Sequence, residues 1–165
     1  MLKATIRVPR FAPHTDARPR FESHELELGE RASILDALFA LQRGPVSDLA
    51  FRYSCRVGMC GSCAMVVNGR EQLACSTLVK SAGPELKIEP LRNLPVVRDL
   101  AVDLAPLFTA YKKTLPHFTP RPDLGRYEFY RLPHDSPEWQ ALNHQPQCID
   151  CGACFDECPV GAIHY

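Results

Sequence analysis

The stretch FRYSCRVGMCGSCAMVVNGREQLAC, residues 51–75, holds four cysteines in the spacing C-x4-C-x2-C-x11-C. They are Cys55, Cys60, Cys63 and Cys75, with Gly58 and Gly61 among them. This spacing matches the loops by which thiolates hold a [2Fe–2S] cluster. Glycine lets the backbone approach a ligand and point N–H groups at sulfur, and such hydrogen bonds offset the negative charge of a cluster. The stretch therefore predicts an iron–sulfur site.

A second group of four cysteines lies near the end of the sequence. Cys148, Cys151, Cys154 and Cys158 form C-x2-C-x2-C-x3-C, and Pro159 follows directly. This is the run that holds a cubane cluster in bacterial ferredoxins. Zinc is the alternative for both groups, although structural zinc sites usually carry two separated C-x2-C pairs. Disulfides are a third interpretation, which the lack of an apolar, signal-like run in residues 1–20 disfavours.

The composition narrows the functions to consider. The chain has 165 residues, 45% of them hydrophobic, which suits one ordinary domain or two small ones. Its 19 Lys and Arg balance 19 Asp and Glu, so charge gives no reason to expect nucleic acid or an anionic membrane surface as a partner. No apolar run is long enough to span a bilayer. We therefore expect a soluble, intracellular protein whose cysteines bind metal or do redox chemistry.

The residues around the first cysteine group predict a small domain over residues 1–95. Alternating β-prone stretches, an N-capped apolar run and an Asn-Gly turn supply its elements. We expect strands at 4–8 and 22–28, a helix from Ser33 to Gly44, a hairpin at 64–74 and a closing strand at 86–89. Together these make a β-grasp, ferredoxin-like fold. The hairpin explains the longest spacing, because it carries the chain away from Cys63 and returns Cys75 to the same end.

Residues 96–165 are expected to form a second, mainly helical and incomplete domain of the ferredoxin cubane type, so that the whole chain is α+β. Apolar residues recur every three or four positions at Leu100, Leu104, Leu107, Tyr111 and Leu115, which predicts an amphipathic helix. Pro106 is expected either to kink this helix or to begin a second helix in its first turn. The proline-rich residues 116–147 should cross irregularly to the second cysteine group.

The chain resembles the iron–sulfur subunit of succinate dehydrogenase and fumarate reductase, respiratory complex II. The resemblance rests on the first cysteine stretch, on SILDALFAL before it, and on VVRDLAVDL, FTAYKKTLPHF and SPEWQALNHQPQCIDCGACFDECP after it. It covers nearly the whole chain and the N-terminal two-thirds of that subunit. It implies an oxidoreductase component of the tricarboxylic acid cycle or of fumarate reduction, with no catalytic acid, base or nucleophile of its own.

The resemblance also implies cofactors and partners. Electrons would pass from the covalently bound FAD of a flavoprotein subunit to a [2Fe–2S] cluster, then a [4Fe–4S], then a [3Fe–4S], and on to quinone beside membrane-anchor subunits. The chain would then lie peripherally on the cytoplasmic face of the inner membrane, held by its partners. No nucleic acid is expected as a partner.

By the same resemblance, each cysteine receives a role. Those at 55, 60, 63 and 75 would hold the [2Fe–2S] cluster, and Cys148, Cys151 and Cys154 would give three ligands to the [4Fe–4S]. Cys158 would serve the neighbouring [3Fe–4S] cluster. Only seven residues follow Cys158 here, whereas the family continues with a further cysteine loop. We therefore expect either a shortened form of a longer subunit or a chain with at most one cubane, whose fourth ligand would be Cys158.

Other readings stay open. A free-standing, soluble ferredoxin-like electron carrier would use the same β-grasp domain, and a zinc-bound structural module would use the same thiols. Arg52 and Arg56 either add positive potential near the first cluster or are solvated surface residues. In an isolated copy, the Cys148–Cys158 loop is expected to find little to pack against.

Overall fold

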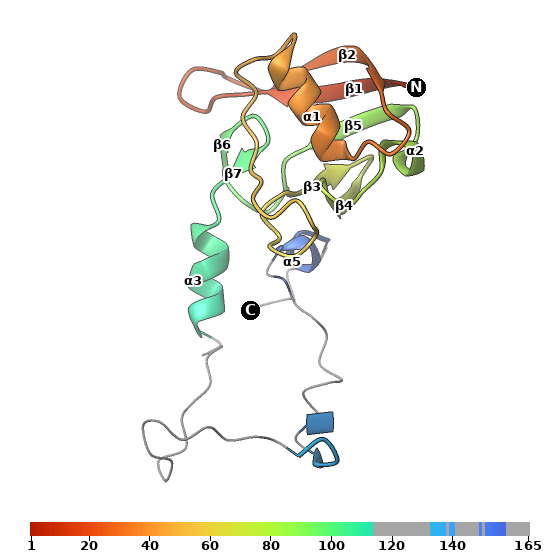
Figure 1. Cartoon of the computed structure of the whole chain (residues 1–165). Helices are drawn as coiled ribbons and strands as arrows, with labels where there is room; N and C mark the ends of the chain where they lie inside the picture. The colour runs from red at the N-terminus through yellow and green to blue at the C-terminus, as the bar shows by residue number, and fades with distance from the viewer. Residues whose placement is uncertain (114–132, 138, 141–148, 150, 158–165) are drawn as a thin grey trace.

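The computed structural model describes residues 1–113, 133–137, 139–140, 149 and 151–157. Their largest unit is a five-stranded mixed sheet with helix α1 lying across one face, as Figure 1 shows. The elements are β1 Leu2–Arg10, β2 Arg20–Leu28, α1 Ile34–Arg43, β3 Ala64–Val67, β4 Arg70–Leu73, α2 Val79–Ala82, β5 Glu85–Glu89, β6 Val96–Arg98, β7 Ala101–Val102, α3 Ala105–Lys113 and α5 Ala153–Glu157.

The strand order of the large sheet is β2-β1-β5-β3-β4. Strand β1 pairs antiparallel with β2 along its whole length and parallel with β5, while β3 pairs antiparallel with β4 and β5. A parallel pair needs a long crossover connection, and here the connection contains α1. This order is that of a β-grasp sheet. The predicted α+β, ferredoxin-like fold class is thereby confirmed.

Helix α1 begins where the sequence signals predicted. Ser33 is its N-cap: the Asp36 amide donates to Ser33 Oγ at 3.2 Å, and the Ser33 amide donates to Asp36 Oδ2 at 2.9 Å. Such a reciprocal cap satisfies two helix-terminal donors and contributes about 1 kcal/mol. The helix buries Ile34, Leu35, Ala37, Leu38 and Leu41 against the sheet. Its apolar face therefore supplies one side of the main core.

The predicted hairpin is formed by β3 and β4. Asn68 and Gly69 make its turn with φ values of 50° and 84°, as a two-residue turn of this kind requires. The side chain of Asn68 makes three further hydrogen bonds. Its Nδ2 donates to the carbonyls of Ala82 and Glu85, each at 3.1 Å, and its Oδ1 accepts from the Lys87 backbone amide at 2.8 Å. One side chain thus fixes the hairpin to the chain that enters β5.

The expectation of a helix beginning near Leu100 is wrong. Strands β6 and β7 occupy residues 96–102 as an antiparallel pair, and Asp99 turns the chain between them with φ 48°. Helix α3 begins only at Ala105, with Pro106 in its first turn. The expectation that this proline begins a helix is confirmed, although strands and not a first helix precede it. The expected helix also extended to Leu115, which lies outside the described residues. Helix α2 was not predicted.

Asp99 explains why the chain turns there instead of forming a helix. Its side chain is only 2% exposed, and its carboxylate accepts from the Phe11 amide at 2.9 Å, the Ala50 amide at 3.0 Å and Arg10 Nε at 3.2 Å. The Leu100 amide donates to the Ala50 carbonyl at 3.0 Å. These bonds hold the β6–β7 pair against the segment that leads into the first cysteine group.

The helices in the described part of the chain are all too short or too polar to cross a membrane.

Candidate functional site

The first four cysteines meet at one end of the sheet. Three of them, Cys55, Cys60 and Cys63, lie in the first cysteine loop, residues 54–63, and Cys75 follows β4. The Ala74 amide donates to the Cys63 carbonyl at 3.1 Å, which closes the base of the hairpin and sets Cys75 beside Cys63. Cys63 is buried, Cys55 and Cys75 are half-buried, and Cys60 is exposed. The structure therefore brings together the residues that the spacing predicted.

Backbone amides in this loop point at the thiol sulfurs. Met59 N and Val57 N lie 3.3 and 3.5 Å from Cys55 Sγ, and Gly58 N lies 3.2 Å from Cys75 Sγ. The left-handed φ of Gly58, 74°, contributes to the curl that turns these donors inward. N–H groups aimed at sulfur stabilise thiolates and the negative charge of a cluster. The loop is therefore built to hold anionic sulfur.

Two thiols of the loop have shifted acidities. A hydrogen bond of 3.4 Å with the Ser62 hydroxyl, helped by contacts with Cys55, lowers the pKa of Cys60 to about 6. Burial is the main cause that raises the pKa of Cys63 to about 11; a hydrogen bond from the Cys75 backbone opposes the rise, and the Cys75 thiol adds to it. Because the thiolate is the nucleophile and the ligand form, the two thiols should differ sharply in reactivity before any cluster is bound.

We expect iodoacetamide to modify Cys60 of the metal-free chain well before Cys63. The Cys60 thiol is mostly thiolate above pH 6, so its rate should rise with pH through that value and level off near neutrality, while Cys63 stays protonated. Peptide mass spectrometry of a time course at pH 5 to 8 measures both rates. Ser62→Ala should slow the modification of Cys60 at pH 6 and leave the modification rate of Cys63 unchanged. Equal rates at the two thiols of the unsubstituted chain would refute the assigned difference in pKa.

The donor set fits a two-iron cluster. The four thiols lie as two neighbouring pairs, Cys55 with Cys60 and Cys63 with Cys75. Each iron of a [2Fe–2S] cluster takes two thiolates, so each pair can hold one iron. Among the described residues, no three His, Cys, Asp or Glu side chains come together as ligands of one metal ion.

The second cysteine group is described only in part. Cys148 and Cys158 lie outside the described residues, while Cys151 is half-buried and Cys154 is exposed. A Cβ atom on Gly61 would lie only 2.7 Å from Cys151 Cα and 2.7 Å from the Ile149 carbonyl oxygen. Backbone from the second group therefore rests directly on the first cysteine loop, at a position where only glycine fits.

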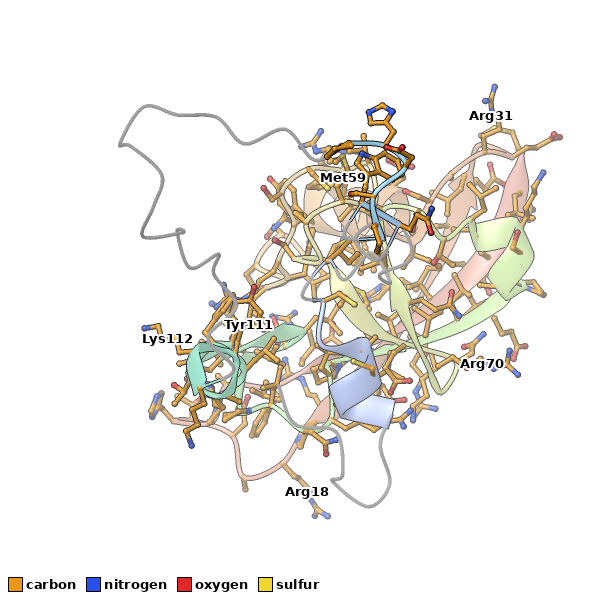
Figure 2. The ribbon with its side chains drawn as sticks, turned by 90° about the horizontal axis from the view of Figure 1, so that it is seen from below. Arg18, Arg31, Met59, Arg70, Tyr111 and Lys112 are labelled. Atoms are coloured by element: carbon orange, nitrogen blue, oxygen red, sulfur yellow. The ribbon has the colours of Figure 1, made fainter. Side chains whose placement is uncertain are left out.

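Further contacts fix this second segment. Asp156, in α5, is buried; its Oδ1 accepts from the Asn93 amide at 2.6 Å, and the Asn93 side-chain amide donates to the Asp156 carbonyl at 3.0 Å. Gly152 is buried beside Leu107 and Leu91. Figure 2 shows α5 beside strand β4. The expectation that this loop has little to pack against is thus wrong for its described part.

A cavity of about 410 Å³ lies where the two cysteine groups meet. Its walls include Met59, Cys60, Leu104, Phe108, Ile149 and Cys151. A cysteine of each group therefore lines one shared, largely apolar space. Sequence reasoning did not find this juxtaposition, nor the Asn93 and Asp156 contact that supports it, because neither has a local sequence signal.

A β-grasp sheet with four thiols gathered at one end, three of them in a loop rich in amide donors, defines a ferredoxin-like iron–sulfur protein. Residues 5–109 match the family described as 2Fe-2S iron-sulfur cluster binding domain, and residues 146–164 match the 4Fe-4S binding domain. The first match covers more than half of the chain. The chain belongs to the 2Fe-2S iron–sulfur cluster binding family.

Curated relatives are similar over nearly the whole chain. It is 33% identical to the fumarate reductase iron–sulfur subunit of Mycobacterium tuberculosis, over 99% of the chain and 66% of that protein. It is 34% identical to the mitochondrial succinate dehydrogenase [ubiquinone] iron–sulfur subunit of Dictyostelium discoideum, over 93% of the chain and 55% of that protein. The chain thus spans roughly two-thirds or less of these relatives' lengths.

A solved structure has the same fold. A chain in the Mycobacterium smegmatis Sdh1 complex in the apo form superposes with a TM-score of 0.80 and 32% identity, over 96% of this chain and 64% of that one.

Proposed function

We propose that the chain is an electron-transfer iron–sulfur subunit of a succinate dehydrogenase or fumarate reductase. The observation that carries the proposal is the quartet of thiols with amide donors, on a fold that superposes on a chain of the Sdh1 complex at 32% identity. The chain would pass electrons between the FAD of a flavoprotein subunit and quinone-side clusters. In this role none of its side chains would take part in converting the substrate.

The chain's own residues prepare the first site for this role. A [2Fe–2S] cluster supplies one-electron oxidation and reduction when bound by Cys55, Cys60, Cys63 and Cys75. The amides of residues 57–59 stabilise the negative charge that reduction adds at the sulfurs. Cys63 lies in the hydrophobic core, which excludes water from one side. Cys60 is exposed, and so are the side chains of Val57 and Met59 in the same loop. The exposed apolar rim is where a flavoprotein partner would dock.

The second cysteine group would hold a second cluster within the 96–165 domain. Cys148, Cys151 and Cys154 are proposed as ligands of a [4Fe–4S] cluster. Cys158 would be its fourth ligand or would serve a [3Fe–4S] cluster completed by further chain or by a partner. The direct contact of Gly61 with Cys151 supports this arrangement, because it keeps the path between the two ligand sets short. The first domain is proposed to end near residue 95.

In the full complex the chain would be peripheral to the membrane. Partner subunits that anchor the complex and bind quinone would hold it there, and the cytoplasmic face of the inner membrane is the proposed location. A tagged chain should therefore co-purify with a polypeptide that carries covalent FAD. A monodisperse monomer that exchanges electrons with small redox carriers, and retains no flavoprotein, would favour the free-standing carrier instead.

Cluster reconstitution tests the ligand assignment. After anaerobic loading with iron and sulfide, the reduced chain should give a [2Fe–2S] EPR signal, and Cys60→Ala should lose it because one iron then lacks a thiolate. Ser62→Ala changes the adjacent side chain without removing a ligand, and should keep the signal. Persistence of the signal in Cys60→Ala, or a colourless, zinc-loaded wild type, would contradict the proposal.

A further inference from the structure

We propose that Arg56 is a positioning residue for the first cluster. Its guanidinium stacks on Phe39 and Tyr53 and so fixes the left-handed turn from which the next three amides reach the thiol sulfurs. The inference rests on the proposed function, because its effect is read from a [2Fe–2S] cluster in the first cysteine loop.

The backbone at Arg56 has an unusual conformation. Its φ is 62°, and the other described non-glycine residues with positive φ are Asn68 and Asp99, types that tolerate this region better than arginine. The amides that follow Arg56, those of residues 57–59, donate to the sulfurs of Cys55 and Cys75. A return of residue 56 to the usual negative φ would turn these donors away from the sulfurs.

The side chain of Arg56 is held by two aromatic rings. Its Cζ lies 5.0 Å from the ring centroid of Phe39 and 5.3 Å from that of Tyr53. The two rings meet edge to face with centroids 4.8 Å apart, and Phe51 extends the group. Phe39 belongs to α1, whose capped, buried helix is a rigid support. The stacked guanidinium therefore ties the cysteine loop to the most firmly packed element nearby.

Stacking and charge make separable contributions. Arg56 also places a positive charge one residue from Cys55, and reduction of a cluster adds a negative charge there. Lysine keeps the charge but lacks the planar group that stacks on aromatic faces. Phe39→Leu keeps every charge and every residue of the cysteine loop but removes one stacking surface. An effect of that change on the cluster would be transmitted by the ring contacts of Phe39 with Arg56 and Tyr53.

A reductive EPR titration of the reconstituted chain tests the proposal. We expect Arg56→Ala to lower the equilibrium constant for reducing the [2Fe–2S] cluster about tenfold, as the loss of one hydrogen bond to a charged group would. Arg56→Lys and Phe39→Leu should each lower it about threefold, since both loosen the turn without removing charge. Arg18→Ala is the charge control: Figure 2 places Arg18 at the opposite end of the molecule from Met59 of the cysteine loop, so no change is expected.

The outcomes separate this inference from the proposed function. A normal wild-type signal with unchanged reduction in both Arg56→Lys and Phe39→Leu would overturn the inference alone, because charge would then explain any effect of Arg56→Ala. Absence of a [2Fe–2S] signal in the wild type would overturn the proposed function and this inference with it. Circular dichroism of each variant checks folding, and Arg56→Lys, a conservative change at an exposed site, tests the proposal should Phe39→Leu fail to fold.

Discussion

Replacing Asp99 with alanine is expected to lower the free energy of unfolding by about 3–5 kcal/mol, because it breaks a buried ionic and hydrogen-bonded group. The change leaves the amides of Phe11 and Ala50 and the guanidinium of Arg10 without the carboxylate that they share. It also puts alanine at a φ of 48°, where aspartate is better tolerated. Urea denaturation followed by circular dichroism measures the loss.

Asp48 is the matched control for Asp99. It also pairs with Arg10, at 2.7 Å, but its side chain is 57% exposed. An exposed ion pair is worth about 0–1 kcal/mol, so Asp48→Asn should cost far less than Asp99→Ala. Asp99→Asn should lie between them, since asparagine keeps the turn but not the charge. Similar losses for Asp48→Asn and Asp99→Ala would show that burial at Asp99 does not matter.

The second large effect is expected for Gly61→Ala. The new methyl group would lie 2.7 Å from both Cys151 Cα and the Ile149 carbonyl oxygen, so the second cysteine segment must move away from the first cysteine loop. We expect amide hydrogen exchange in residues 149–157 to accelerate at least about tenfold, as local opening becomes easier. Mass spectrometry of the corresponding peptides measures the change.

Gly58→Ala separates this clash from backbone strain. Gly58 has a similar φ, 74° against 69° at Gly61, so alanine costs each site about 1–2 kcal/mol of left-handed strain. However, a Cβ on Gly58 would meet no atom closer than 3.6 Å, from Ser76. Its effect should stay within the first cysteine loop. Equal exchange of residues 149–157 in the two variants would show that Gly61 does not position the second segment.

Sequence signals were sufficient to predict the elements whose geometry depends on neighbouring residues. Ser33 marked the start of α1, and Asn68 with Gly69 marked the hairpin, because caps and two-residue turns depend on neighbouring residues. The grouping of the first four cysteines followed from the same hairpin. The sequence therefore predicted the sheet's principal elements and the first site.

The features that the sequence did not predict depend on contacts between residues far apart in the chain. The spacing of Leu100, Leu104 and Leu107 fits a helix, yet the bonds from Asp99 to residues 11 and 50 impose a turn and a strand pair. Gly61 was expected to let the backbone approach a cluster, and its contact with Cys151 joins residues 90 positions apart. Arg56 gave no sign of its stacking on Phe39, which comes from another element. Such pairings have no local periodicity or motif.

The β3–β4 hairpin gives the first site one more property. Because it separates Cys63 from Cys75, a cluster bound by all four thiols would cross-link positions 55 to 75 around a closed loop of chain. In the unfolded state such a cross-link removes conformational freedom, and for a loop of this length the stabilisation is about 3 kcal/mol. The hydrophobic core that packs α1 on the sheet is made chiefly of residues outside this loop. Folding can therefore precede metal loading. A cluster inserted afterwards would act as a cross-link that raises the melting temperature of the folded domain.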